Sequence, residues 1–544
     1  MLFAKRYNHM AKRFLLVNPY YPISETPSPP LGLAFLAGAL EAAGHEVEIL
    51  DLVVFPYSKE KLKQVLGRFA PHFVGFTAVT MNVENALSVL RDAKAILPDI
   101  LTIMGGPHVT FCAERTMRAV PEIDLVVLGE GEETIVELAR VSQNPQGWST
   151  VKGLVYRDGN DINATTSRPF LKHIDALAPP ARHLIPLGRY RALGLPVSMT
   201  TSRGCPFQCI FCVGRKMVGA KVRYRDPLKV VDELAYLNTL GFNQINIADD
   251  LFTAAPKHCL AVCDEIITRG LNVRWTSFAR VDTVSLEVLK RMKVAGCTAV
   301  SFGVETGNPA MLKRIKKGIT LEQVTAAVKM CNDAGITPHA SFILGLPGET
   351  RETIDETVAF GEKLKSMGVL HGFHLLAPFP GTDVRDNNQA YDLCIESHDW
   401  NDYHANRAIV STRGASQEML DEVVLGWEAN FDLWLDRLKK RRASGEADEE
   451  EAWPLTNLEH TVLMYDLMMK QVLENLDPVS EGTADNAAGD PTGLALKHLV
   501  NCIHDSLEQS TDEILKTLSH AVQRGYLRLR QKDGYSHWEW VDYL

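Results

Sequence analysis

T-T-S-R-G-C-P-F-Q-C-I-F-C is the sequence of residues 200–212, and it places Cys205, Cys209 and Cys212 within eight positions. Their spacing is C-x3-C-x2-C. Thiolates are the soft ligands that iron–sulfur clusters require. Three thiolates on one short loop can hold three irons of a four-iron cluster, which leaves the fourth iron without a protein ligand. The loop therefore predicts a cluster with one open coordination site.

Two other interpretations of these cysteines are a zinc knuckle and a set of buried core thiols. A zinc site usually needs four ligands, and no His or Cys closely follows Cys212. The run Gly204-Cys205-Pro206 is typical of a turn, not of the interior of a helix or strand. Both observations favour the iron–sulfur cluster.

The cysteine spacing, with the aromatic Phe211 just before the third cysteine, resembles the signature of the radical S-adenosylmethionine (SAM) enzymes. In that family the open iron chelates the amino and carboxylate groups of SAM. An electron from the cluster then cleaves a C–S bond to give a 5′-deoxyadenosyl radical. The resemblance implies a [4Fe-4S] cluster on Cys205, Cys209 and Cys212, with SAM as a second cofactor and Phe211 beside them.

The composition excludes several kinds of protein. The 544 residues suffice for about three or four domains, and 46% hydrophobic residues is ordinary for a soluble protein. A net charge of −10 without a long basic run argues against nucleic acid as a partner. No apolar run reaches the roughly 18 residues of a membrane span, and residues 14–17 are too short for a signal peptide. Ten cysteines, three of them assigned to a cluster, fit a reducing compartment. We therefore expect a cytoplasmic protein that does not bind membranes.

Residues 1–150 alternate between strand-like and helix-like patterns. Apolar runs at 14–18, 46–50, 73–80, 101–104 and 125–128 read as strands, and residues 31–43, 59–69 and 83–96 have helical spacing. This β-α-β-α order predicts a doubly wound, mostly parallel sheet with helices on both faces. Ligands of such sheets bind beyond the carboxyl ends of the strands.

The loops at those ends carry glycines, which let the backbone approach a large flat ligand, and helix N-termini, which accept anionic groups. The stretches are Asn18-Pro19-Tyr20, Pro29-Pro30-Leu31-Gly32-Leu33, residues 77–82, Gly105-Gly106-Pro107-His108-Val109 and Gly129-Glu130-Gly131-Glu132. Together, ahead of the cysteine loop, they resemble the cobalamin-binding domain of cobalamin-dependent radical SAM enzymes. The resemblance implies that cobalamin contacts Asn18, Pro30, Leu31, Gly32, Thr80, Gly105, Gly106, His108, Gly129 and Glu130.

The N-terminal domain departs from many cobalamin proteins in one respect. The D-x-H-x-x-G loop, whose His ligates cobalt, is absent. His108 could face the corrin ring, or it could be a turn histidine that only forms hydrogen bonds with the backbone. The alternative for the whole domain is a flavodoxin-like module with a nucleotide-binding or structural role.

Residues 151–195 read as an ordered linker that begins with a hairpin at 153–160. Residues 196–385 then repeat a strand–helix pattern six times, which is too few for a closed eight-stranded barrel and matches the partial (βα)6 barrel of the radical SAM fold. The family pattern implies that SAM is contacted by residues that follow successive strands: Asp249, Asp250, Arg280, Glu305, Gly345 and Pro347. The alternative for each acidic residue is a solvated loop residue or a helix cap.

Residues 386–544 are predicted to form a mainly helical C-terminal domain. The tail at 535–544 is aromatic. It could be a terminal strand that docks on a helix, or a lid over a flat or apolar substrate.

These patterns predict a cobalamin-dependent radical SAM enzyme that methylates an unactivated carbon of a small molecule under anaerobic conditions. A reductant such as flavodoxin or ferredoxin would supply electrons. One alternative is cyclisation or rearrangement without methyl transfer, as in the anaerobic cyclase of chlorophyll synthesis. A methylthiotransferase would need three further N-terminal cysteines, and only Cys112 precedes the loop. A non-enzymatic sensor would not need the residues that contact SAM.

Overall fold

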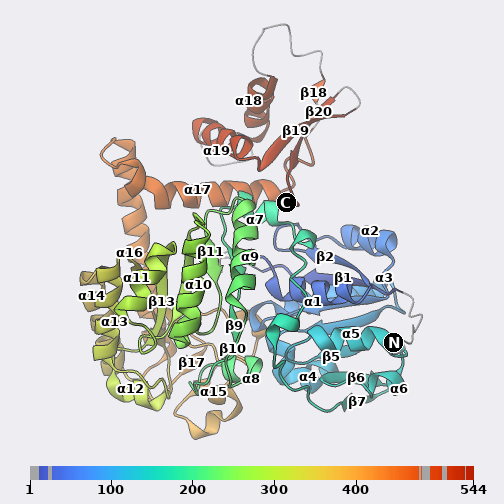
Figure 1. The fold of residues 1–544 in the computed structure, drawn as a ribbon, viewed down its shortest axis with the longest axis horizontal. Coiled ribbons are helices and arrows are strands. Elements are labelled where there is room, and N and C mark those ends of the chain that lie inside the picture. Colours follow the sequence, from blue (N-terminus) through green and yellow to red (C-terminus); the bar gives the residue numbers. More distant parts are fainter. Residues whose placement is uncertain (1–10, 22–26, 477–478, 481–490, 505–510, 533–534) are drawn as a thin grey trace.

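The computed structural model describes residues 11–21, 27–476, 479–480, 491–504, 511–532 and 535–544. Figure 1 shows an N-terminal α/β domain and an α/β barrel side by side, with the elements that follow residue 448 above both. This arrangement confirms the predicted fold class. No helix among the described residues is long and apolar enough to cross a membrane.

The N-terminal domain contains a seven-stranded sheet in the order β2-β1-β3-β4-β5-β6-β7. The strands are β1 (Arg13–Asn18), β2 (Glu46–Asp51), β3 (Phe73–Thr77), β4 (Leu101–Gly105), β5 (Leu125–Val127), β6 (Leu154–Asp158) and β7 (Asp161–Ala164). The first five are parallel. The helices are α1 (Leu31–Ala42), α2 (Lys59–Phe69), α3 (Val83–Ile96), α4 (Pro107–Ala119) and α5 (Glu132–Arg140). The order reverses between β1 and β3, where doubly wound folds bind their ligands.

Both faces of this sheet are buried because helices pack on each of them, and successive side chains of a strand point to opposite faces. Phe14 and Leu16 pack in the same core cluster as α1 and α5. Leu15 and Val17 pack in the cluster that holds α2, α3 and α4. The uninterrupted apolar run of β1 therefore reflects a central strand covered on both faces.

The predicted linker begins inside this sheet. β6 pairs antiparallel with β5, and β7 pairs antiparallel with β6, so the sheet continues across residue 150 to Ala164. The chain then passes through two short 3₁₀ turns and α7 (Leu187–Ala192) before it enters the barrel. The hairpin was predicted at this position, but its pairing with β5 was not.

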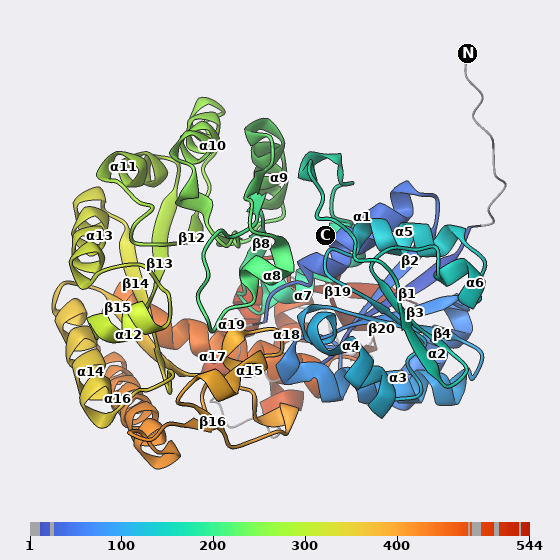
Figure 2. The ribbon, with the colours of Figure 1, turned by 90° about the horizontal axis from the view of Figure 1, so that it is seen from below.

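The barrel is an open six-stranded parallel sheet in the order β15-β14-β13-β12-β11-β8. Its strands are β8 (Val197–Met199), β11 (Ile245–Ile247), β12 (Trp275–Ala279), β13 (Cys297–Glu305), β14 (Thr337–Leu344) and β15 (Leu370–Leu375). Figure 2 shows the covering helices along the outside of this crescent. They are α9 (Pro227–Thr239), α10 (Pro256–Thr268), α11 (Leu286–Val294), α13 (Leu321–Ala334) and α14 (Arg351–Ser366). The predicted six-unit partial barrel is confirmed.

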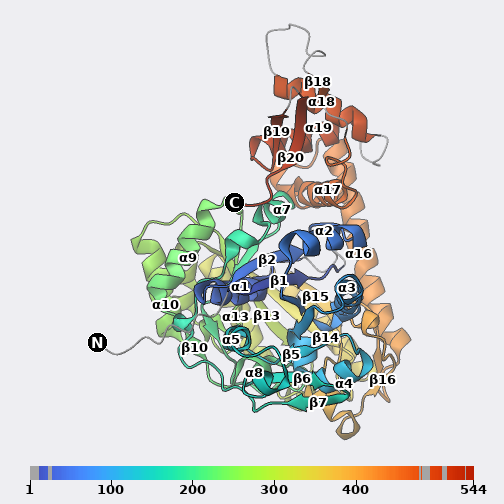
Figure 3. The ribbon, with the colours of Figure 1, turned by 90° about the vertical axis from the view of Figure 1, so that its right-hand side faces the viewer.

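The C-terminal region combines helices with a three-stranded sheet, β18-β20-β19. It begins with a two-stranded ribbon of β16 (Cys394–Ile395) and β17 (Val410–Ser411). The elements that follow are α16 (Gln417–Ala443), α17 (Glu449–Met469), β18 (Val479–Ser480), α18 (Pro491–His504), α19 (Thr511–Gln523), β19 (Leu527–Lys532) and β20 (Tyr535–Trp540). Figure 3 shows the sheet and its two helices standing apart from the other domains.

The aromatic tail forms β20 and docks on a helix, as one hypothesis predicted. Trp538 Nε1 donates a hydrogen bond to the Ala495 carbonyl of α18 at 3.4 Å. Beyond β20, Asp542 accepts a 2.7 Å hydrogen bond from Arg189 of α7. Because α7 leads into the amino end of β8, whereas the cysteine loop follows its carboxyl end, the tail lies at the opposite end of the barrel. This position does not support the lid hypothesis.

Candidate functional site

The cysteine loop leaves the carboxyl end of β8 and is closed by a two-stranded ribbon. β9 (Ser202–Arg203) pairs antiparallel with β10 (Arg223–Tyr224), and residues 204–222 lie between them. Gly204 has φ of +125°, and a Cβ there would lie 2.4 Å from the Lys221 carbonyl oxygen, so the start of the loop requires glycine. The amide of Ile210 donates to the Ile315 carbonyl at 3.2 Å, which fixes the middle of the loop to the barrel.

Cys205, Cys209 and Cys212 are free thiols; the first two are partly buried and Cys212 is exposed. Phe207, between the first two cysteines, lies under the guanidinium of Arg280 at 3.5 Å from the ring centroid. Among the described residues, no three His, Cys, Asp or Glu side chains are grouped to hold a single metal ion. The assignment of a cluster to these cysteines therefore rests on their spacing and on the comparisons below.

Asp249 and Asp250 follow β11, and the structure separates their roles. The buried Asp249 carboxylate accepts hydrogen bonds from the Thr201 amide at 2.6 Å and from the Ser202 hydroxyl at 2.7 Å. It holds the strand end that precedes the cysteines, so it does not fit the predicted contact with SAM. Asp250 lines a cavity beside the cysteine loop, and its contact with SAM stays a prediction. Burial raises the pKa of both carboxyls.

Arg280 and Glu305 also have partners within the protein. Arg280 donates to Asp282 at 2.9 Å, so its charge is neutralised locally while it stacks on the cysteine loop. Glu305 forms a 2.5 Å ion pair with Lys317, and both side chains are 8% exposed. Glu305 has φ of +72°, an uncommon conformation for a residue with a side chain and one that clusters at functional sites. The ammonium of Lys317 lies 6.0 Å from the ring centroid of Phe211.

The turn at 345–349, which contains the predicted SAM contacts Gly345 and Pro347, is closed by its own glutamate. The Gly345 amide donates to the Glu349 carboxylate, and Arg314 donates to the carbonyls of Pro347 at 3.3 Å and Gly348 at 2.8 Å. Burial raises the pKa of Glu349 to about 7. These contacts preform the turn.

A cavity of about 390 Å³, here called the cofactor cavity, opens between the carboxyl ends of the first sheet and the cysteine loop. The N-terminal domain contributes glycines and apolar side chains, and the barrel side contributes Thr200, Ser202, Arg203, Met217 and Asp250. A second cavity of about 520 Å³, the adjoining cavity, shares Gly32, Leu33, Thr77 and Pro107 with it. The two cavities together connect both domains.

The cofactor cavity fits a large ligand in contact with the backbone. A Cβ at Gly32 or Gly129 would meet nothing within 4 Å, so the backbone there faces open space. Oε2 of Glu132 is buried in the cavity wall and has no hydrogen-bond partner in the described part of the chain. An amide or hydroxyl of a ligand could donate to this oxygen. These features fit a flat macrocycle with amide groups, such as cobalamin.

The predicted cobalamin residues divide between the two cavities. Gly32, Gly105, Gly106, Gly129 and Glu130 line the cofactor cavity, and Asn18, Pro30, Gly32 and Thr80 line the adjoining cavity. Leu31 is the first residue of α1 and lines neither.

His108 lines neither cavity. It is 2% exposed, its Nδ1 lies 3.1 Å from the Thr80 hydroxyl, and its ring meets the Trp400 ring edge-on at 4.8 Å. Burial lowers the pKa of His108 to about 4, and Arg385 and Arg115 act in the same direction. These contacts do not fit the predicted corrin-facing role; His108 joins the N-terminal domain to the segment that contains Trp400.

Asn18 is one part of a buried polar group that the sequence did not reveal. Its Nδ2 donates to Asp51 at 2.8 Å, and Tyr190 of α7 donates to the other Asp51 oxygen at 2.8 Å. Burial raises the pKa of Asp51 from 3.8 to about 6.

This shift predicts a pH-dependent effect of Asp51→Asn. Between the unfolded and folded pKa values the folded chain binds more protons, so the contribution of Asp51 to the free energy of unfolding falls as pH rises. We expect the wild-type value minus the variant value to fall by up to about 3 kcal/mol from a pH of about 4 to about 7. Urea unfolding of both proteins at several pH values measures this difference. A difference that does not change with pH would contradict the prediction.

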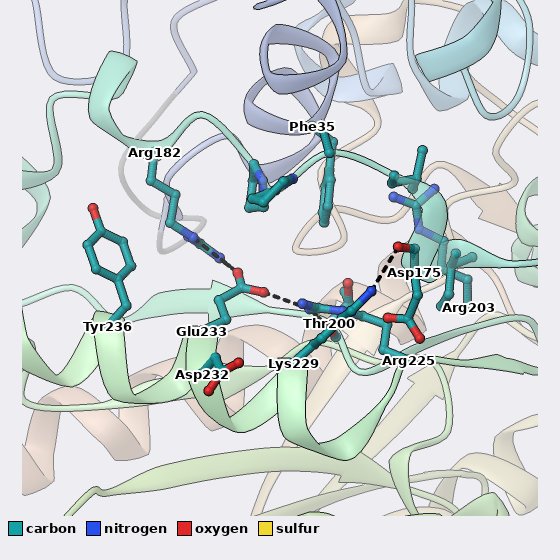
Figure 4. Close-up of a pocket in the computed structure, with 15 residues that line it drawn as sticks. Phe35, Asp175, Arg182, Thr200, Arg203, Arg225, Lys229, Asp232, Glu233 and Tyr236 are labelled. Atoms are coloured by element: carbon teal, nitrogen blue, oxygen red, sulfur yellow. Dashed lines mark hydrogen bonds and ion pairs between the residues drawn. The ribbon is translucent and has the colours of Figure 1, made fainter. Parts of the chain in front are cut away.

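A further cavity of about 490 Å³ lies between α1, the linker and α9. Figure 4 shows Phe35 pointing into it and Glu233 held from two sides by Arg182 and Arg225. Each of these ion pairs measures 2.6 Å. This cavity, here called the linker cavity, shares Thr200 and Arg203 with the cofactor cavity.

Two family models match the chain. Residues 24–139 match the B12 binding domain, and residues 199–361 match the radical SAM superfamily. The first match covers the loops that line the cofactor cavity, and the second begins at the end of β8 and includes the three cysteines.

Curated relatives cover most of the chain. It is 34% identical to an uncharacterized methyltransferase of Pyrococcus horikoshii, PH0819, over 73% of this chain and 86% of that protein. It is 32% identical to the anaerobic magnesium-protoporphyrin IX monomethyl ester cyclase of Cereibacter sphaeroides, over 73% of this chain and 66% of the cyclase.

Two solved structures share the fold. The cobalamin-dependent S-adenosylmethionine radical enzyme OxsB, with aqua-cobalamin and SAM bound, aligns with a TM-score of 0.66 at 17% identity, over 96% of this chain and 82% of that chain. The radical SAM methyltransferase TsrM of Kitasatospora setae, with cobalamin and a [4Fe-4S] cluster bound, aligns with a TM-score of 0.59 at 24% identity, over 69% of this chain and 77% of that chain.

Proposed function

The chain belongs to the radical SAM superfamily and carries a B12-binding domain, and we propose from this membership that it methylates an unactivated carbon of a small molecule. When bound, a [4Fe-4S] cluster supplies the electron that cleaves SAM, and cobalamin supplies the methyl group. The methyltransferase PH0819, to which the chain is 34% identical, supports methyl transfer.

The observation that carries the proposal is the cofactor cavity, which has walls from both domains. Gly32 and Gly129 leave the backbone open on the N-terminal side, and Asp250 lies on the barrel side next to the cysteine loop. In this proposal Cys205, Cys209 and Cys212 hold the cluster, and Asp250 accepts a hydrogen bond from the SAM amino group. The walls that the two domains contribute limit the access of water to the reacting groups.

Anaerobic purification followed by iron, cobalt and visible-absorption measurements tests the proposal. We expect four irons per chain and, after reconstitution with hydroxocobalamin, one corrinoid per chain. Iron without any corrinoid would overturn methyl transfer from cobalamin. A chain that binds no iron after reconstitution would overturn the radical SAM assignment of the loop.

A second candidate is oxidative cyclisation without methyl transfer, which the 32% identity to the anaerobic cyclase favours. The two reactions can be separated with SAM that carries a labelled methyl group. Methylation places the label in the product, whereas cyclisation leaves it out.

The remaining expectations concern the cell. The reaction needs electrons, so we propose a flavodoxin or ferredoxin as reductant, in an anaerobic cytoplasm. A purely sensory role would be favoured over catalysis if the loaded protein bound SAM and cobalamin without cleaving SAM in the presence of reductant.

A further inference from the structure

The ribbon that closes the cysteine loop has two arginines directly opposite each other. Arg203 of β9 pairs with Arg223 of β10 in the ribbon register. Both side chains reach Glu130, which follows β5 in the N-terminal domain. Arg203 donates to Glu130 at 3.3 Å, and Arg223 donates to its two oxygens at 2.9 Å each. One carboxylate of the N-terminal domain therefore holds both strands at the base of the cysteine loop.

Further contacts hold the same two arginines. Arg203 donates to Glu132 at 2.7 Å, and its guanidinium lies 5.0 Å from the ring centroid of Phe35 on α1. Arg223 donates to the carbonyls of Leu171 at 2.7 Å and Val218 at 2.6 Å. The arginines thus connect the loop to the N-terminal domain and to the linker.

These ion pairs are shielded from water. The side chains of Arg203, Arg223 and Glu130 are 15%, 8% and 9% exposed. Buried ion pairs add little net stability, because desolvation offsets their attraction. Their paired hydrogen bonds instead fix direction and distance, and the two-oxygen contact of Arg223 allows little rotation. This geometry suits groups that must be held in one relative position.

The ion pairs lie between the cysteine loop, which is the predicted cluster site, and the cofactor cavity. Arg203 is two residues before Cys205, and Arg203, Glu130 and Glu132 all line the cofactor cavity. Arg203 also lines the linker cavity (Figure 4), so its side chain borders both spaces. A ligand in the cofactor cavity would touch the same residues that hold the cysteine loop.

We propose that Glu130, Arg203 and Arg223 form a clamp that sets the position of the cysteine loop relative to the cofactor cavity, and that this clamp transmits cobalamin binding to the cluster. The three are positioning residues, since they act through the loop. This inference rests on the proposed function, and it adds a positioning role to the predicted contact of Glu130 with cobalamin.

Glu130→Gln tests the clamp, because it keeps the shape of the side chain and removes its charge. In the metal-free chain, we expect amide hydrogen exchange of residues 204–222 to quicken by about tenfold or more. In the iron-loaded protein, the electron paramagnetic resonance signal of the reduced cluster should change when cobalamin is added to wild type. That change should be absent in Glu130→Gln and return in Glu130→Asp, which restores the charge.

Glu137→Gln is the matched control. Like Glu130, Glu137 belongs to the N-terminal domain and pairs with an arginine, Arg168. Arg168, however, belongs to the linker and not to the ribbon. The control should leave both the exchange of residues 204–222 and the cobalamin-induced signal as in wild type. If Glu130→Gln does not fold, Arg223→Lys provides the second variant, since it keeps the charge and loses the paired contact. It should show the same faster exchange of residues 204–222 and the same absence of a cobalamin-induced signal change.

Three results would overturn the clamp. The first is exchange of residues 204–222 at the wild-type rate in Glu130→Gln, and the second is a cobalamin-induced signal change that persists in Glu130→Gln and Arg223→Lys. The third is faster exchange and an absent signal change in the control, Glu137→Gln. If wild type binds cobalamin without any change in the cluster signal, transmission fails while the proposed function stands. If wild type binds no cobalamin, the proposed function itself fails, which is a different observation.

Discussion

Cys209→Ala is expected to leave the reconstituted chain with almost no [4Fe-4S] cluster and to abolish SAM cleavage. The loop provides three thiols, and the next cysteine in the sequence, Cys259, is buried in α10. Two thiolates cannot hold three corners of a cluster, so removal of the middle ligand leaves no substitute. Iron and sulfide content, the absorption spectrum and 5′-deoxyadenosine formation measure the loss.

Cys394→Ser is the matched control, because Cys394 is an exposed thiol outside the loop. It should load iron and cleave SAM as wild type does. Thermal unfolding of the two apoproteins should differ little, since Cys209 is only partly buried and Ala fits a loop. Full iron loading of Cys209→Ala would show that the cysteine loop is not the cluster site. Equal losses of iron and of SAM cleavage in both variants would point to a general effect on folding.

The features that could be predicted from the sequence are those that depend on the spacing of nearby residues. The six strand–helix units and the doubly wound domain follow from periodic apolar patterns, and the cysteine loop follows from three residues within one turn-rich stretch. Each of these features is encoded in a short window, so tertiary contacts did not have to be known.

The roles of single side chains could not be predicted in the same way. Asp249 looked like a ligand contact, but its hydrogen-bond partner Thr201 lies 48 residues earlier. Glu130 was predicted to contact cobalamin and lines the cofactor cavity, but the sequence did not reveal its ion pairs, because Arg203 and Arg223 lie 73 and 93 residues later. A strand-end carboxylate has the same sequence pattern whether it faces a ligand or a buried arginine. The only sequence signal for these ion pairs was the position of Arg203 within residues 200–212, next to the cysteines.

Gly32→Phe is expected to weaken cobalamin binding by roughly 10–100-fold without weakening the fold. Gly32 is the second residue of α1, and a Cβ there would meet no atom within 4 Å. Gly32 lines both the cofactor cavity and the adjoining cavity, so an aromatic ring would occupy space needed by a large ligand. Glycine costs a helix about 1 kcal/mol relative to Ala, so the variant should unfold at the same or a higher urea concentration.

Gly67→Phe controls for the added ring. Gly67 lies on α2, and a Cβ there also meets no atom within 4 Å, but it lines neither cavity. Titration with hydroxocobalamin, followed by absorption, should give wild-type affinity for Gly67→Phe and a large loss for Gly32→Phe, while both load iron normally. A stable Gly32→Phe protein with wild-type cobalamin affinity would place the corrinoid elsewhere. The clamp would then have no ligand to sense, because it borders the same cavity.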